Sequence, residues 1–240
     1  MKVLISKIEL ILNMISGIIP FEVKCLIKIV WDWNGTLLND VDLSFQCMNR
    51  LLAKNGLTKL KDLDAYRSVF EFPVEKYYQT VGFDFNKTPF SDLAHDYMAD
   101  YQDKSYTCNL FADVLDTINK ASDLGFYQAV LSASHKDYLL AQISNLRMES
   151  KFDSIWGIED IYANSKEAIA HAFKETCTLD DEIWFVGDSL HDFEVANSIG
   201  ANCILVSTGH QNRNRLSQAN VKIVDSLKEG LDYIYERSQN

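Results

Sequence analysis

The side chains of this chain that could do chemistry stand at the ends of apolar segments. Asp32 ends one apolar run and precedes a Gly-Thr turn, while Ser132 and Asp188 each follow a later apolar run. Lys166 stands at the start of a predicted helix. Open α/β sheets bind ligands at the carboxyl ends of their strands, so these four side chains are expected to meet at one rim of a sheet.

These residue types in one place point to phosphoryl chemistry. Two carboxylates from different strand ends, Asp32 and Asp188, form an oxygen-rich site suited to Mg²⁺, which also accepts phosphate oxygens. The Ser132 hydroxyl, backbone amides after a strand end and the Lys166 amine supply donors for a phosphoryl group. An Asp carboxylate can itself attack phosphorus and form a covalent intermediate.

The elements that must position these residues alternate between strands and helices in the second half of the chain. Strands are predicted at 25–31, 126–131, 154–158, 183–186, 202–206 and 221–224, and helices at 110–124, 137–146, 165–176, 190–199 and 226–236. Between residues 39 and 106 the pattern predicts only helices, at 40–55, 63–70, 74–81 and 89–104. Such alternation indicates a parallel sheet with right-handed crossovers. We therefore expect an α/β fold: a Rossmann-like, doubly wound core (25–38 and 107–240) with an inserted all-helical cap (39–106).

Composition narrows the class of protein. The 240 residues are 47% hydrophobic and 24% charged, enough for a sizeable core. The net charge of −11 argues against a nucleic-acid partner, which would need clustered basic residues. Five scattered cysteines suit reduced thiols, and hence a cytoplasmic location, better than disulfides or a zinc site.

Residues 1–24 are apolar but interrupted by Lys7, Glu9 and Asn13, which fits neither a signal peptide nor a membrane span. They are expected to form an amphipathic helix that packs on the core or on a second copy of the chain, the latter giving a homodimer. A membrane-surface role is disfavoured because the polar face lacks basic residues.

The order and spacing of these residues resemble the four motifs of the haloacid dehalogenase superfamily. Residues 32–36 read Asp-Trp-Asn-Gly-Thr where the family has Asp-x-Asp-Gly-Thr, and Ser132 ends the second motif strand. Lys166 matches the third motif, and residues 187–192 match the fourth, Gly-Asp-x-x-x-Asp. The helical insert looks like the cap of the phosphoglycolate phosphatase-like branch.

The resemblance implies a Mg²⁺-dependent phosphohydrolase acting on a small phosphorylated metabolite, with roles for particular residues. Asp32 would be the nucleophile, and Asp32, Asp188 and the Asn34 carbonyl would hold Mg²⁺, with Asp192 supporting the metal site. Phosphate would be bound by a further set of residues: Thr36, Ser132, Ala133 and Lys166.

The departure from the family pattern is Asn34. The family's phosphatases use an Asp there as general acid and base, and an amide can do neither, which removes help typically worth about 10²–10⁴ in rate. Three histidines follow predicted strand ends, His135, His191 and His210, and His135 is the favoured substitute because it lies three residues beyond Ser132.

Two alternatives to a phosphatase stay open. One is an attenuated protein that binds a phosphorylated ligand or regulates through it. The other is a phosphonate hydrolase, because that branch also lacks the second Asp; it needs a cap lysine for a Schiff base. In the cap, Arg67, Lys76, Tyr77 and Tyr78 are candidates to face the cleft and select the substrate, although at least one of the two tyrosines is expected to pack inside the cap.

Overall fold

The computed structural model describes residues 26–158 and 166–239. The predicted helix at 1–24 lies outside the described residues. None of the helices in the described ranges is long and apolar enough to cross a membrane.

Six parallel strands form one sheet in the order β3-β2-β1-β4-β5-β6. The strands are β1 (Ile27–Trp31), β2 (Tyr127–His135), β3 (Ser154–Ile158), β4 (Glu182–Gly187), β5 (Asn202–Val206) and β6 (Lys222–Val224). The chain builds outward from β1 to β3, then returns to β4 on the other side of β1. The strand order therefore reverses between β1 and β4, and such a switch point opens a crevice at the carboxyl ends of the strands.

The strands form where they do because both faces of the sheet are covered. All five residues of β1 are buried, which suits an unbroken apolar strand in a parallel sheet. Its one polar residue, Lys28, is paired with Asp181 at 3.0 Å. The register places Trp31 beside Val186 of β4, so both strands end at the same level.

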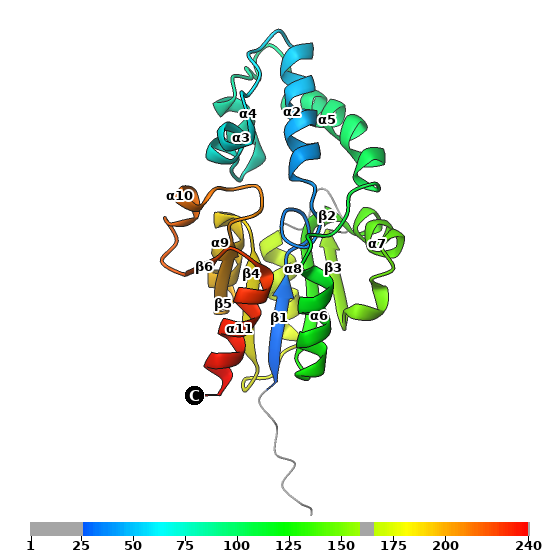
Figure 1. Cartoon of the computed structure of the whole chain (residues 1–240). Coiled ribbons are helices and arrows are strands. Elements are labelled where there is room, and N and C mark those ends of the chain that lie inside the picture. The colour runs from blue at the N-terminus through cyan, green and yellow to red at the C-terminus, as the bar shows by residue number, and fades with distance from the viewer. Residues whose placement is uncertain (1–25, 159–165, 240) are drawn as a thin grey trace, which may run out of the picture.

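Helices pack on both faces of the sheet (Figure 1). One apolar cluster joins the sheet to α6 (Val114–Asp123), α7 (Lys136–Asn145) and α11 (Leu227–Ser238). The other joins it to α8 (Lys166–Glu175), α9 (Leu190–Ser198) and the short α10 (Arg213–Leu216). This two-faced core confirms the predicted Rossmann-like α/β class.

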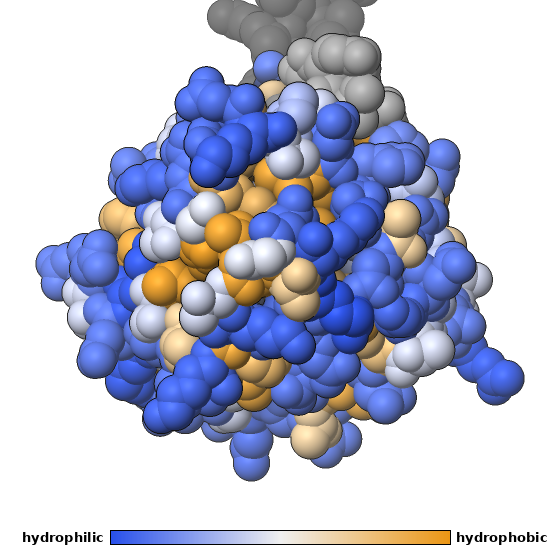
Figure 2. Space-filling view, turned by 90° about the horizontal axis from the view of Figure 1, so that it is seen from above, coloured by the Kyte–Doolittle hydropathy of each residue, from blue (hydrophilic) through white to orange (hydrophobic). Residues whose placement is uncertain are grey.

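The stretch between β1 and α6 contains helices and no strand of the sheet, as expected. The helices are α2 (Val41–Lys54), α3 (Leu63–Val69), α4 (Val74–Thr80) and α5 (Phe90–Ser105). They share an apolar cluster separate from the two that pack on the sheet, and they lie beyond the carboxyl ends of the strands (Figure 1). From the cap side, apolar residues gather near the middle of the face with polar residues around them (Figure 2). The division into domains at residues 38 and 106 stays a prediction.

The sequence-based boundaries differ from the observed ones mainly at three elements. Helix α6 begins at Val114, four residues after the predicted start. Strand β2 runs to His135, four residues beyond the predicted end, because its polar tail pairs with β3 after a shift in register. Helix α10 was not predicted, since its four residues are too few to show an apolar period.

Candidate functional site

Asp32 is fixed at the switch point by the backbone around it. Its N–H donates to the Val186 carbonyl of β4 at 2.9 Å, which ties the residue to the neighbouring strand. The following turn needs Gly35, whose φ is +75° and where a Cβ atom would lie 2.4 Å from both Asp188 and His210. The turn therefore packs directly against the next acidic residue of the site.

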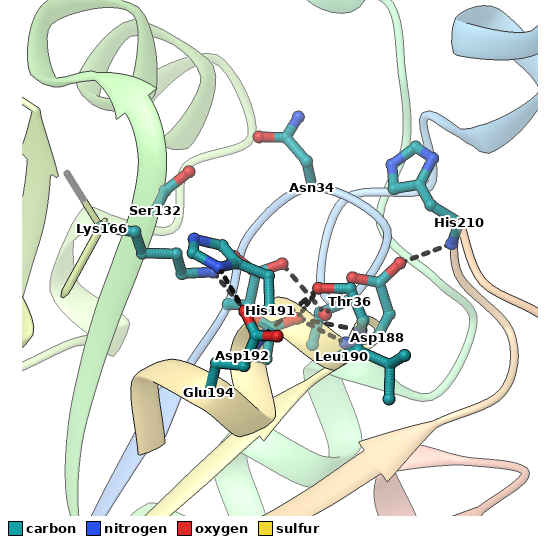
Figure 3. A network of polar contacts seen from close by, with 12 residues as sticks. Asn34, Thr36, Ser132, Lys166, Asp188, Leu190, His191, Asp192, Glu194 and His210 are labelled. Atoms are coloured by element: carbon teal, nitrogen blue, oxygen red, sulfur yellow. Dashed lines mark hydrogen bonds and ion pairs between the residues drawn. The ribbon is translucent and has the colours of Figure 1, made fainter. Parts of the chain in front are cut away.

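Three buried carboxylates meet here: Asp32, Asp188 and Asp192 offer ligand atoms that all lie within 4.8 Å of one another. The Thr36 hydroxyl lies 3.2 Å from Asp32 and 3.4 Å from Asp188, and the His210 backbone N–H donates to Asp188 (Figure 3). The structure thus brings both carboxylates expected to bind metal into one place. It also puts Thr36 between them, rather than free to face a phosphate.

Asp192 differs from the other two because its oxygens already have partners. One oxygen accepts from the backbone N–H groups of Asp188 and Ser189 and from the Ser189 hydroxyl, closing a capping box at the start of α9. The other lies 2.5 Å from the Lys166 amine. Asp192 therefore holds α9 and Lys166 in place, and its support of a metal site stays a prediction.

Lys166 bridges Asp32 and Asp192 at the start of α8 and is itself buried (Figure 3). Burial disfavours its charged form, but the two carboxylates outweigh that effect and raise its pKa. The amine is therefore a permanent cation beside the expected nucleophile.

One ammonium does not balance three buried carboxylates. Burial raises the pKa of Asp32 to about 7 and that of Asp188 to about 6, despite opposing contributions from Lys166 and His210. Burial also opposes ionisation of Asp192, but Lys166 and Ser189 together lower its pKa. A site of hard oxygen donors with excess negative charge has the ligand chemistry of a Mg²⁺ site, so the residues fit the ion that the sequence implies.

Three of the four phosphate-binding candidates line the same pocket, and Thr36 does not. Ser132, Ala133 and Lys166 all contribute to a cavity of about 170 Å³ above Asp32. The Ser132 hydroxyl oxygen accepts from the Ser134 N–H at 3.1 Å. The end of β2 thus supplies donors across the pocket from the carboxylates.

Asn34 has every polar atom of its side chain occupied. Its amide nitrogen donates to Asp40 at 3.2 Å and to the Tyr101 hydroxyl at 2.9 Å, and its amide oxygen accepts from Ser134 at 2.9 Å. Asp40 is buried and also accepts from the Gly35 N–H. The amide thus joins the first turn, the cap and the end of β2.

The three histidine candidates have different surroundings. His135 caps the start of α7 by accepting from the Asp137 N–H, its side chain is 35% exposed, and it is not among the residues that line the pocket. His191 stacks on Phe72 with ring centroids 4.7 Å apart. His210 is the histidine that lines the pocket, so the pocket lining does not support the preference for His135. The His135 ring caps helix α7, which begins directly after β2.

The His210 ring is held from both sides. Its Nε2 lies 3.3 Å from Asp40, and its Nδ1 lies 2.8 Å from the Tyr66 hydroxyl of α3. Burial lowers the pKa of His210, but the Asp40 carboxylate reverses that effect and raises it to about 9. The ring is therefore cationic near neutral pH and paired with Asp40, whose own pKa is lowered by the same contact against the effect of burial.

The cap residues expected to face the cleft do not do so. Arg67 donates to the backbone carbonyls of Thr208 and Gly209, and Lys76 pairs with Glu71. Both predicted tyrosines are buried in the cap cluster instead, as expected for at least one: Tyr77 and Tyr78. The cap residues that do line the pocket are Phe70 and Phe72, which sequence patterns did not single out.

Comparisons with known proteins agree with this geometry. The family model for haloacid dehalogenase-like hydrolases matches residues 29–206. No curated protein matches the chain. A predicted phosphatase from Clostridium acetobutylicum is similar at 20% identity with a TM-score of 0.73, covering 89% of this chain and 100% of that one. A haloacid dehalogenase-like hydrolase from Streptococcus pneumoniae is similar at 19% identity with a TM-score of 0.74, covering 88% and 98%.

Proposed function

The chain belongs to the haloacid dehalogenase-like hydrolase family, and on that premise we propose that it is a Mg²⁺-dependent phosphohydrolase of small phosphate monoesters. The observation that carries the proposal is the convergence of Asp32, Lys166 and Ser132 on one pocket with two further buried carboxylates, Asp188 and Asp192. Phosphatases among the similar folds support it. The neighbouring carboxylates and donors are what an in-line attack on a phosphoryl group requires.

In the proposed reaction the Asp32 carboxylate attacks phosphorus. An oxygen–phosphorus bond forms to Asp32 while the bond to the ester oxygen breaks, and the leaving oxygen takes up a proton. Water then attacks the aspartyl-phosphate, which releases phosphate and restores the carboxylate. Lys166 and the end of β2 at Ser132 and Ala133 would hold the phosphoryl oxygens.

The metal would be held by Asp32, Asp188 and the backbone carbonyl of Asn34. When bound, Mg²⁺ supplies positive charge between the carboxylates and the phosphoryl oxygens. Asp192 keeps Lys166 directed at Asp32, so the ammonium and the carboxylate remain in register.

Asn34 cannot protonate the leaving group, because its amide has no acidic proton and its hydrogen bonds are all taken. The rate is therefore expected to depend steeply on the acidity of the leaving alcohol. His135, the substitute expected from the sequence, is not among the described residues that line the pocket.

The phosphonate-hydrolase alternative finds less support. Lys166 is the only lysine among the described residues that line the pocket, and it is already bound to two carboxylates. Of the cap lysines, Lys54 pairs with Asp96 and Lys76 with Glu71, both with exposed amines. A Schiff base with substrate would need a cap lysine at the pocket.

The test is turnover of 4-nitrophenyl phosphate by the purified chain with and without Mg²⁺. We expect Mg²⁺-dependent release of nitrophenol that is abolished in Asp32→Asn and retained in Asp96→Asn, a control that removes an exposed cap carboxylate. Full activity of Asp32→Asn would refute the assigned nucleophile. No turnover by the wild-type chain, together with Mg²⁺-dependent stabilisation by inorganic phosphate, would favour the ligand-binding alternative.

A further inference from the structure

The wall of the pocket opposite Asp32 is formed by the stretch between α3 and α4, and this stretch is fastened to the core. Arg67 donates to the carbonyls of Thr208 and Gly209, at 2.8 Å in each case. The Gln211 side chain donates to the Phe70 carbonyl at 3.0 Å. These bonds join the cap to the loop after β5, so the aromatic side chains that follow Arg67 have a defined place.

Those aromatic side chains are Phe70 and Phe72. The Phe70 ring lies 4.9 Å from the His210 ring, and the Phe72 ring stacks on His191 at 4.7 Å. Both phenylalanines are half-buried and line the cavity. The part of a substrate that extends from the phosphoryl group toward the cap therefore meets flat apolar surface.

Among the described residues that line the cavity, the basic side chains are Lys166 and His210, and both already contact protein groups. The Arg67 guanidinium donates from Nε to the Gly209 carbonyl and from Nη2 to the Thr208 carbonyl, and Lys76 pairs with Glu71 at 3.0 Å. The His210 ring has both nitrogens in contact with protein groups, and Lys166 is held by two carboxylates.

We propose that the substrate is a small monoester whose organic group is uncharged and apolar, an aromatic ring above all, and that esters carrying a second anionic group are rejected. This inference rests on the proposed phosphohydrolase function. A carboxylate of the substrate would be desolvated against Phe70 and Phe72 without a partner, which is unfavourable, whereas a ring would stack on them. The cavity of about 170 Å³ lies below the ~300–1,000 Å³ of common ligand pockets, which limits the group to about one ring.

Binding of non-hydrolysable phosphonates tests the preference without relying on turnover. Calorimetry with Mg²⁺ would compare phenylphosphonate, 4-carboxyphenylphosphonate and the uncharged 4-carbamoylphenylphosphonate, which has nearly the shape of the carboxylate. We expect the carboxylate to bind at least about tenfold more weakly than both others, the loss set by an unpaired charge. Equal or tighter binding of the carboxylate, or binding of none of the three, would overturn the proposal.

A substitution in the wall tests whether its apolar side chains cause the expected rejection of a carboxylate. Phe72→Arg is expected to raise the affinity for 4-carboxyphenylphosphonate relative to phenylphosphonate by about tenfold, because it supplies the absent partner. Phe85→Arg is the matched control, since Phe85 packs on Phe90 elsewhere in the cap. An unchanged ratio in folded Phe72→Arg would refute the assigned wall. If that variant does not fold, Phe72→Ala should weaken phenylphosphonate binding several-fold, and unaltered binding would refute it equally.

Turnover of 4-nitrophenyl phosphate separates the two proposals. If the protein binds the phosphonates in the expected order but does not hydrolyse the ester, the proposed enzymatic function is wrong and the proposed specificity of the pocket stands. If it hydrolyses the ester but binds the carboxylated phosphonate more tightly, only the proposed substrate class is wrong.

Discussion

Replacing Asn34 by Asp restores the family's acid but places it in surroundings that an acid disturbs. The amide nitrogen of Asn34 donates to Asp40 at 3.2 Å and to Tyr101 at 2.9 Å. In Asn34→Asp a carboxylate oxygen takes the place of that nitrogen, so two carboxylates face each other. Two unit charges about 4 Å apart repel by about 4 kcal/mol at an effective dielectric constant of 20. At about 1.4 kcal/mol per pKa unit, this is about three units.

The new carboxyl is therefore expected to keep its proton well above the usual range, with His210 offsetting part of the repulsion through Asp40. When the pKa of a carboxyl is higher in the folded than in the unfolded state, its contribution to the free energy of unfolding is present at low pH. That contribution is lost as the pH rises through the pKa of the folded state. We expect Asn34→Asp to be about 1–2 kcal/mol less stable than the wild type at pH 5, where the unfolded carboxyl is already ionised, and about 2–4 kcal/mol less stable at pH 8.

The raised pKa of the new carboxyl in Asn34→Asp also determines how the hydrolysis rate of that variant depends on pH. A protonated carboxyl can assist a poor leaving group, so we expect phenyl phosphate hydrolysis to rise by about 10²-fold or more near pH 6 and the gain to shrink toward pH 8. The gain should be smaller for 4-nitrophenyl phosphate, whose leaving group needs less help. The assays are kcat/KM for both esters from pH 5 to 8 and urea unfolding at both ends of that range.

Asn34→Leu is the matched control, because it removes the hydrogen bonds without adding charge. Its loss of stability should not depend on pH. If Asn34→Asp and the wild type show the same difference in unfolding free energy at pH 5 and pH 8, and the rate gain is constant over that range, the two carboxylates do not interact and the reasoning fails.

Three further outcomes follow from the carboxylate cluster and the close packing around it. Burial raises the pKa of Asp32 to about 7 and that of Asp188 to about 6, so the metal-free protein should lose thermal stability as pH rises from 5 to 8. Millimolar Mg²⁺ should reverse this trend in melting curves. A melting temperature of the metal-free protein that does not change with pH would contradict this expectation. Lys166→Met leaves buried carboxylates uncompensated and should cost about 3–5 kcal/mol in urea unfolding, part of it recovered with Mg²⁺; a loss below 1 kcal/mol would show that the pairs are weak. Gly209→Ala places a Cβ atom 2.1 Å from the Asp188 carboxylate and should weaken the Mg²⁺-induced rise in melting temperature, whereas Gly230→Ala, with 3.5 Å to its nearest neighbour, should keep it.

The core of the site could be predicted from the sequence because topology alone places it. Asp32, Ser132 and Asp188 follow apolar strands, and parallel strands of one sheet end at the same rim, so their convergence needs no knowledge of side-chain packing. Lys166 opens the crossover helix α8 beside them. The fold class and the motif residues could be predicted from the sequence for the same reason.

The wall of the pocket could not be predicted from the sequence, because it depends on how the cap packs on the core. Arg67 carries the chemistry of an anion ligand, yet the loop after β5 offers it two carbonyls. Phe70 and Phe72 look in sequence like any apolar residues of a helical cap. The contact of Asp40 with His210 joins residues from opposite ends of the chain that no periodicity relates.

The contacts of Asn34 explain why an amide suits this site. The buried polar groups around the pocket include four carboxylates, Asp32, Asp40, Asp188 and Asp192, and two cationic groups, Lys166 and His210. With all of them ionised the net charge is −2, which one divalent cation balances. Without that cation, burial raises the pKa of Asp32 to about 7 and that of Asp188 to about 6. A fifth carboxylate at position 34 would leave the site one charge out of balance and would remove one of the donors to Asp40. Asn34 thus suits the charge arrangement of Asp40 and His210, because its amide donates to Asp40 without adding a charge.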